Sequence, residues 1–172
     1  RQAEALGAAL DVVVTPCGGG GLLAGVATAV KALSPRTALI GAEPAGYDDT
    51  LRSLQAGERQ PLTPRARTLC DALESPCPGE LTFPILLRHV AGMAVVTDTE
   101  VAAAVRFAAT TLKLVAEPGE PQHSLAEGAG AAGLAALLAG KVDTFGGRTV
   151  GLVLSGGNID PDLLARILRD EI

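Results

Sequence analysis

Four consecutive glycines, Gly18 to Gly21, stand between an apolar run at residues 11–15 and a segment of helical periodicity at residues 22–33. Backbone without side chains at a strand-to-helix junction can turn its N–H groups toward an anion, and the helix N-terminus adds partial positive charge there. Glycine also permits positive φ angles and the close approach of a ligand. The pattern predicts a site for a phosphorylated cofactor or a nucleotide.

A second glycine-containing loop lies near the other end of the chain. Ser155-Gly156-Gly157-Asn158 follows an apolar run at residues 148–154 and precedes a helix that begins near Asp160 and Pro161. Ligands of open parallel sheets bind beyond the carboxyl ends of the strands, so the two loops can converge on one small ligand. The Ser155 hydroxyl can bond a neutral ring nitrogen, which favours a pyridine over a nicotinamide ribose.

The elements that must position these loops alternate along the chain. Two further apolar runs, at residues 37–43 and 92–97, are typical of buried strands, and a capped helical pattern covers residues 98–113. The alternation predicts an α/β fold in which helices flank a parallel twisted sheet. Residues 61–79 are rich in Pro, Arg and Cys and are expected to form a surface excursion, and residues 118–124 form a second irregular stretch.

Composition excludes several classes of function. The net charge of −5 argues against nucleic acid as a partner, and no apolar run is long enough to span a membrane. Cys17, Cys70 and Cys77 are an odd number of cysteines without a Cys-x-x-Cys spacing, which argues against a disulfide framework or a zinc site. A reducing, cytoplasmic location is therefore favoured.

A dinucleotide site is the main alternative from the residues alone. Gly19-x-Gly21-x-x-Ala24 satisfies the looser dinucleotide fingerprint, and Glu43 follows about 20 residues later, where an acid that binds ribose belongs. This alternative predicts a Rossmann-like oxidoreductase domain.

Several segments together resemble one enzyme family. Residues 12–25, 40–44 and 153–158 carry the likeness, and residues 80–85 and 131–136 match in order and approximate spacing. The chain resembles the C-terminal part of the catalytic domain of the serine/threonine dehydratases (threonine ammonia-lyases), which are fold type II pyridoxal 5′-phosphate (PLP) enzymes of the tryptophan synthase β-like fold. The resemblance covers residues 1–172 and implies β-elimination and deamination of threonine or serine to a 2-oxo acid and ammonia.

The resemblance also implies a set of site residues. The glycine loop would hold the cofactor phosphate and Ser155 the pyridine nitrogen, a neutral contact that favours β-elimination over transamination. The implied cofactor-binding residues are Gly18, Gly19, Gly20, Gly21, Leu22, Glu127, Ser155 and Gly156. Glu43, the Tyr47 carbonyl and Asp49 occupy the places of a divalent-cation site, and oxygen ligands suit Mg²⁺ or Ca²⁺.

One part of the family pattern is missing. The Schiff-base lysine of the family lies in a Ser-x-Lys-x-Arg-Gly segment upstream of the glycine loop, and Lys31, Lys113 and Lys141 do not match it. We therefore expect this chain to be inactive alone and to act with a missing N-terminal portion, within a homodimer of the complete enzyme. An inactive truncated subunit is the remaining alternative. Spacing favours Glu127 over Glu117 as the acid beside the cofactor ring, with an insertion at residues 118–126 between them.

Overall fold

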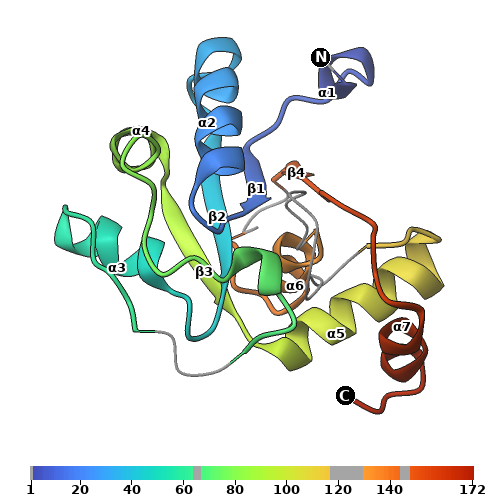
Figure 1. Ribbon diagram of the computed structural model, residues 1–172. Coiled ribbons are helices and arrows are strands. Elements are labelled where there is room, and N and C mark those ends of the chain that lie inside the picture. The colour runs from blue at the N-terminus through green and yellow to red at the C-terminus, as the bar shows by residue number, and fades with distance from the viewer. Residues whose placement is uncertain (1, 64–66, 117–129, 144–147) are drawn as a thin grey trace.

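The computed structural model describes residues 2–63, 67–116, 130–143 and 148–172. Within these residues four strands form one sheet in the order β3-β2-β1-β4, and every pairing is parallel (Figure 1). The strands are β1 Val12–Pro16, β2 Ala38–Pro44, β3 Gly92–Val96 and β4 Val150–Leu152. This confirms the predicted parallel α/β fold, with β4 shorter than the predicted run at residues 148–154.

Helices connect the strands and flank the sheet (Figure 1). They are α1 Gln2–Ala5, α2 Gly21–Leu33, α3 Asp49–Ala56, α4 Phe83–His89, α5 Asp98–Phe107, α6 Ala132–Leu138 and α7 Pro161–Leu168, with a 3₁₀ turn η1 Asp71–Leu73 and a π-helical turn η2 Ala108–Leu112. The helix predicted over residues 98–113 therefore changes from α to π at Ala108. It ends at Lys113, whose φ of 60° is left-handed.

The two faces of the sheet bury alternate residues of the same strand. Val13 and Leu39 pack with Ala27 of α2 on one face. Val12 and Val14 point the other way, into the larger cluster that α5 and α6 complete. Side chains of a strand alternate between faces, so a run of consecutive valines supplies both layers at once. The core is thus made of small aliphatic side chains, as the low aromatic content requires.

The strand order changes direction between β1 and β4. The chain moves from β1 to β2 to β3 along one side of the sheet, and β4 is then added on the opposite side of β1. Neighbouring crossover connections leave a crevice at such a reversal, at the carboxyl ends of the two strands. The glycine loop follows β1 and Ser155 follows β4, so both predicted loops lie at this crevice.

One sequence prediction is wrong. The segment 61–79 is not only a surface excursion, because Cys70 and Leu73 are buried. Residues 67–75, called here the strap, are fixed to the start of α5: the Asp98 carboxylate accepts hydrogen bonds from Thr68 Oγ1 (2.5 Å) and Leu69 N–H (3.1 Å). Long-range side-chain contacts of this kind hold an irregular segment in the interior, and composition alone does not reveal them.

None of the helices in the described residues combines the length and the apolar character that crossing a membrane requires.

Candidate functional site

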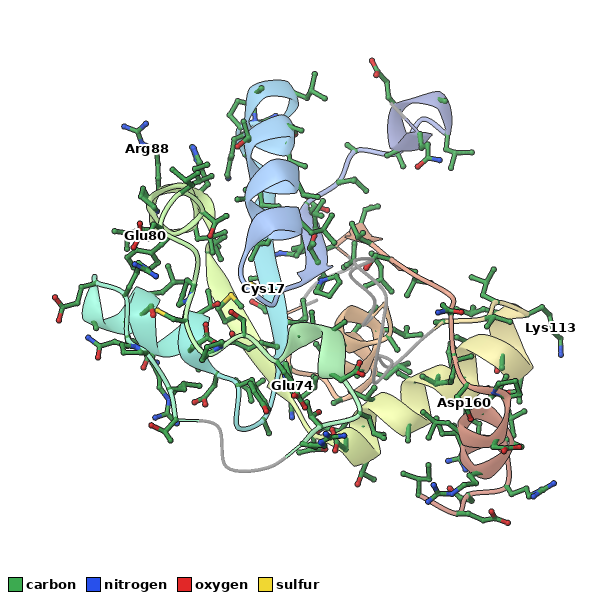
Figure 2. The ribbon with its side chains drawn as sticks, in the orientation of Figure 1. Cys17, Glu74, Glu80, Arg88, Lys113 and Asp160 are labelled. Atoms are coloured by element: carbon green, nitrogen blue, oxygen red, sulfur yellow. The ribbon has the colours of Figure 1, made fainter. Side chains whose placement is uncertain are left out.

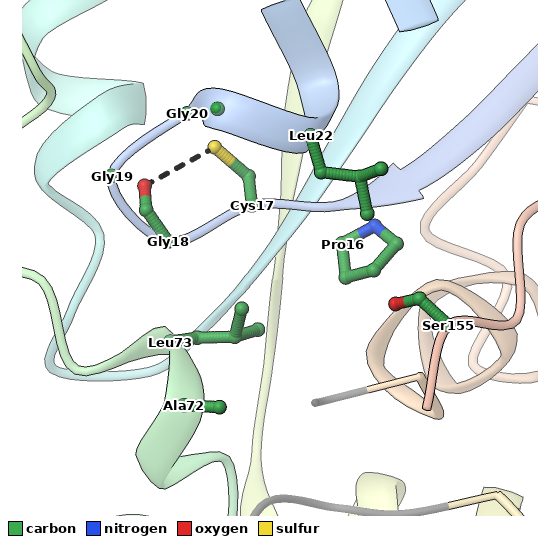
Figure 3. A pocket seen from close by; sticks show the side chains of 10 residues that line it. Pro16, Cys17, Gly18, Gly19, Gly20, Leu22, Ala72, Leu73 and Ser155 are labelled. Carbon is green, nitrogen blue, oxygen red and sulfur yellow. Dashed lines mark hydrogen bonds between the residues drawn. The ribbon is translucent and has the colours of Figure 1, made fainter. Parts of the chain in front are cut away.

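A small, partly open cavity of about 80 Å³ lies at the carboxyl ends of β1 and β4 (Figure 3). It is lined by Pro16, Cys17, Gly18, Gly19, Gly20, Gly21, Leu22, Ala72, Leu73 and Ser155. The cavity brings together the predicted phosphate loop and the predicted ring contact, which are more than a hundred positions apart in the sequence. Ala72 and Leu73 come from the strap, which the sequence pattern predicts to lie on the surface.

The backbone of the glycine loop is held in the form that an anion site needs. Gly20 caps α2 with a left-handed φ of 89°, and a Cβ atom there would lie 2.8 Å from Leu86 Cδ1 and 2.9 Å from Thr82 Oγ1. The Gly19 carbonyl accepts hydrogen bonds from Gly79 N–H (3.0 Å) and Thr82 Oγ1 (2.8 Å). The N–H groups at the start of α2 have no partner within the helix and remain available to an anion.

The Ser155 loop is placed by close backbone packing. Val153 N–H donates to the Val14 carbonyl (3.0 Å), which keeps the chain beside β1 after β4 has ended. A Cβ atom at Gly130 would lie 1.9 Å from the Ser155 carbonyl oxygen, so this contact requires glycine. The Ser155 hydroxyl points toward the cavity (Figure 3). Gly156 adopts a φ of 77° next to it but does not line the cavity, and Glu127 lies outside the described residues.

Glu43 and Asp49 form a buried acidic pair next to the glycine loop, on the side of β1 opposite β4. Glu43 is fully buried, and its carboxylate accepts hydrogen bonds from Thr50 N–H (3.2 Å) and Leu51 N–H (2.9 Å) at the start of α3. Burial raises the pKa of Glu43 to about 8, and the charge of Asp49 adds to this rise. Burial likewise raises the pKa of Asp49 to about 7, and its Oδ2 atom is buried without a hydrogen-bond partner.

These features fit a divalent cation with oxygen ligands, because two buried carboxylates and an unsatisfied oxygen lack a positive partner. Among the residues with described positions, no group of three or more His, Cys, Asp and Glu is placed to hold a metal. The two carboxylates are therefore not enough, and the predicted site would need the Tyr47 carbonyl as its third protein ligand. The same burial leaves Glu43 unable to reach a ribose in the cavity. The dinucleotide alternative therefore loses the acid on which it depends.

The three lysines of the chain have other partners. Lys31 Nζ donates to the Thr37 carbonyl (2.7 Å), and Lys141 Nζ contacts the Glu100 carboxylate (2.6 Å). Lys113 Nζ donates to the Thr110 carbonyl (2.6 Å) at the outer edge of the molecule (Figure 2). None of the three lines the cavity.

Comparison with known proteins identifies the class of enzyme. Residues 2–156 match the family model described as pyridoxal-phosphate dependent enzyme. The serine racemase of Dictyostelium discoideum is 38% identical over 93% of this chain, and the L-threonine ammonia-lyase of Thermotoga maritima is 37% identical over 93%. The matches cover 47% and 37% of those two proteins. The chain thus spans half or less of the length of these relatives.

Solved structures agree with the sequence matches. The crystal structure of a T.th. threonine deaminase superposes with a TM-score of 0.80 at 42% identity, covering 92% of this chain and 50% of that chain. Maize serine racemase gives a TM-score of 0.81 at 32% identity, covering 99% of this chain and 50% of that chain. With its parallel sheet, its paired loops and these relatives, the chain belongs to the pyridoxal-phosphate dependent enzyme family of fold type II.

Proposed function

We propose that this chain is the cofactor-holding part of an ammonia-lyase that converts threonine or serine to a 2-oxo acid and ammonia. The observation that carries the proposal is the shared cavity: the glycine loop at the start of α2 and the Ser155 hydroxyl line one space beyond adjacent parallel strands. Threonine deaminase is among the structures most similar to the chain, which supports a lyase, while the racemases among its relatives define the competing reaction.

The chain's own groups have distinct tasks in this proposal. The N–H groups of Gly18 to Leu22 bind the phosphate, helped by the partial positive charge of the α2 N-terminus. Ser155 donates its O–H to the pyridine nitrogen without protonating it. PLP supplies an electron sink when it is bound, and a neutral ring tempers that sink in favour of losing the β-hydroxyl group. The strap residues Ala72 and Leu73 close one wall of the cavity and exclude water.

Three further components complete the proposal. The Schiff-base lysine comes from a polypeptide segment outside these 172 residues, because none of the lysines here reaches the cavity. A Mg²⁺ or Ca²⁺ ion occupies the site of Glu43, the Tyr47 carbonyl and Asp49, where it relieves the buried negative charge. The complete enzyme works as a cytoplasmic homodimer, which sedimentation analysis and cell fractionation would test.

Cofactor binding can be tested on the chain directly. Calorimetric titration should show that PLP binds and that pyridoxal, which lacks the phosphate, binds far more weakly. Ser155→Ala should weaken PLP binding about fivefold, since one neutral hydrogen bond contributes about 1 kcal/mol. It should leave the affinity for inorganic phosphate unchanged. Ser34→Ala, which removes a hydroxyl far from the cavity, is the matched control. Binding of a nicotinamide dinucleotide without any response to PLP would contradict the proposal.

The reaction needs a second measurement. Once the protein is joined to the lysine-bearing segment, threonine or serine should yield ammonia and a 2-oxo acid in equal amounts. Chiral chromatography of the remaining serine separates the two reactions that the relatives suggest. Formation of D-serine without ammonia would make the enzyme a racemase and overturn the lyase proposal.

A further inference from the structure

The segment after β4 makes its last hydrogen bond to β1 two residues before Ser155. Within the described residues, the final donor is Val153 N–H, which lies 3.0 Å from the Val14 carbonyl oxygen. No hydrogen bond between described residues holds the Ser155 peptide beyond this point, although its half-buried hydroxyl faces the cavity (Figure 3). Packing against neighbouring backbone must therefore set the position of Ser155.

Gly130 supplies the closest of these backbone contacts. A Cβ atom at Gly130 would overlap the Ser155 carbonyl oxygen, and it would lie 2.8 Å from the carbonyl carbon and 3.0 Å from the nitrogen of the same residue. All three atoms are backbone, so no side chain could turn aside to make room. The φ of Gly130 lies outside the left-handed range. Glycine is therefore required here by space and not by conformation.

The residues that follow Gly130 are packed tightly against the sheet. Ala131, which precedes α6, is fully buried. At Gly133, a Cβ atom would lie 2.9 Å from Leu152 Cδ1 of β4 and 3.4 Å from Val14 Cγ1 of β1. The start of α6 thus rests on the same two strands whose ends carry the cavity, and it gives Gly130 a firm base.

A second backbone contact restrains the same loop. A Cβ atom at Gly157 would lie 3.1 Å from the Val115 carbonyl oxygen, in the segment after η2. The loop that carries Ser155 therefore meets other backbone at two of its residues and has little room to shift.

We propose, on the basis of the proposed function, that Gly130 is a positioning residue that places the Ser155 hydroxyl for its hydrogen bond to the pyridine nitrogen. Gly130 does not line the cavity, so it acts through Ser155. A methyl group at this position would push the Ser155 peptide away from α6 and carry the hydroxyl out of place. The phosphate contacts come from the glycine loop between β1 and α2 and should stay as they are.

The test compares PLP with its deaza analogue, in which a C–H group replaces the ring nitrogen. Both ligands carry the same phosphate, so the ratio of their dissociation constants, measured by calorimetry, reports the nitrogen contact alone. The wild-type chain should bind PLP about fivefold more tightly than the analogue, as expected for one neutral hydrogen bond. Gly130→Ala should abolish this preference, as Ser155→Ala does, and leave the affinity for the analogue unchanged. The double variant should lose nothing further, because both changes remove the same hydrogen bond.

Gly133→Ala is the matched control, because its methyl group meets the Leu152 side chain and not Ser155. Urea unfolding should show lower stability in both alanine variants, but Gly133→Ala should keep the preference for PLP. Should Gly130→Ala fail to fold, Gly157→Ala takes its place, because it crowds the same loop against the Val115 carbonyl.

The outcomes separate the role of Gly130 from the proposed function. A folded Gly130→Ala or Gly157→Ala protein that keeps the full preference overturns the positioning role, and so does an equal loss of preference in Gly133→Ala. Equal affinity of the wild-type chain for the two ligands overturns the ring contact, and the role of Gly130 with it, but leaves the phosphate site standing. A wild-type chain that binds neither ligand overturns the proposed function itself.

Discussion

The cofactor cavity is enclosed by two regions that are built in different ways. The glycine loop continues directly from β1 into α2, so its path is set by a strand, a short turn and a helix that are neighbours in sequence. The strap of residues 67–75 contains only one short 3₁₀ turn. It is held by a side chain from elsewhere, because the Asp98 carboxylate binds Thr68 and Leu69. Within the strap, Glu74, which is labelled in Figure 2, accepts a hydrogen bond from Thr68 N–H (3.1 Å).

The two regions meet at one point of close contact. A Cβ atom at Gly18 would lie 3.1 Å from Leu73 Cα and 3.4 Å from the Ala72 carbonyl oxygen. The glycine run therefore serves the strap as well as the ligand, because a side chain at Gly18 would press against the backbone of the strap. The loop carries the polar groups that bind, whereas the strap supplies an apolar wall. Disturbing each region separately should reveal this division of roles.

The largest effect is expected in the glycine loop, from Gly20→Ala. The added methyl group meets Leu86 and Thr82 at under 3.0 Å, and alanine at a φ of 89° is strained. Strain and overpacking together should lower the free energy of unfolding by about 3 kcal/mol. PLP binding should fall beyond detection, because the N–H groups of the loop lose their arrangement. Urea unfolding and PLP titration measure the two effects.

Gly25→Ala is the matched control for this change. Gly25 lies on the exposed side of α2, and a Cβ atom there would meet nothing within 4 Å. Alanine in a helix should stabilise the protein by about 0.5–1 kcal/mol, the opposite sign from Gly20→Ala, and leave PLP affinity unchanged. Equal destabilisation by both variants would contradict the special role of the loop conformation.

The strap should respond next most strongly, to Asp98→Ala. This change leaves Thr68 Oγ1 and Leu69 N–H without their common acceptor, and hydrogen bonds to a charged group contribute about 1.5–3 kcal/mol. We expect about 2 kcal/mol of lost stability and faster limited proteolysis within the strap. PLP affinity should fall only severalfold, since the strap supplies a wall and not the anion contacts.

Asp162→Ala is the control for Asp98→Ala. It measures how much an acidic side chain in the first turn of a helix contributes to stability when it makes no hydrogen bond to the strap. Asp162 is exposed in the first turn of α7, as Asp98 begins α5, but it is remote from the strap. Removing its charge should cost about 0.3–1 kcal/mol, the usual contribution of an acid near a helix N-terminus. A loss as large as that of Asp98→Ala would show that the hydrogen bonds to Thr68 and Leu69 contribute little.

The contrast between the two regions also explains what could be predicted from the sequence. The glycine loop could be predicted from neighbouring residues alone, because the strand, the turn and the helix follow one another between residues 11 and 33. The parallel sheet followed from the alternation of elements, and the joint position of Ser155 followed from the rule that strands present ligands at their carboxyl ends.

The strap could not be predicted, because its fixed points are about 30 positions away in the sequence and use common polar residues. The same limit applied to Glu43, which the sequence offered equally to a ribose or to a cation. Its burial beside Asp49 keeps it out of the cavity, which argues against the ribose. Contacts between residues distant in the chain carry no periodicity or motif, so they become visible only when the fold has placed them.

The smallest effect is expected where the glycine loop is tied to the segment that follows the strap, from Thr82→Val. Thr82 Oγ1 donates to the Gly19 carbonyl at 2.8 Å, but this carbonyl keeps its bond from Gly79 N–H. Because the Gly19 carbonyl still accepts one hydrogen bond, the free energy of unfolding should fall by only about 1 kcal/mol. Thr28→Val is the control, because its hydroxyl bonds only the Ala24 carbonyl within α2. If Thr82→Val weakens PLP binding and Thr28→Val does not, long-range ties also set the anion-binding form of the loop. If the two variants bind PLP equally well, the strand, the turn and the helix position the loop by themselves.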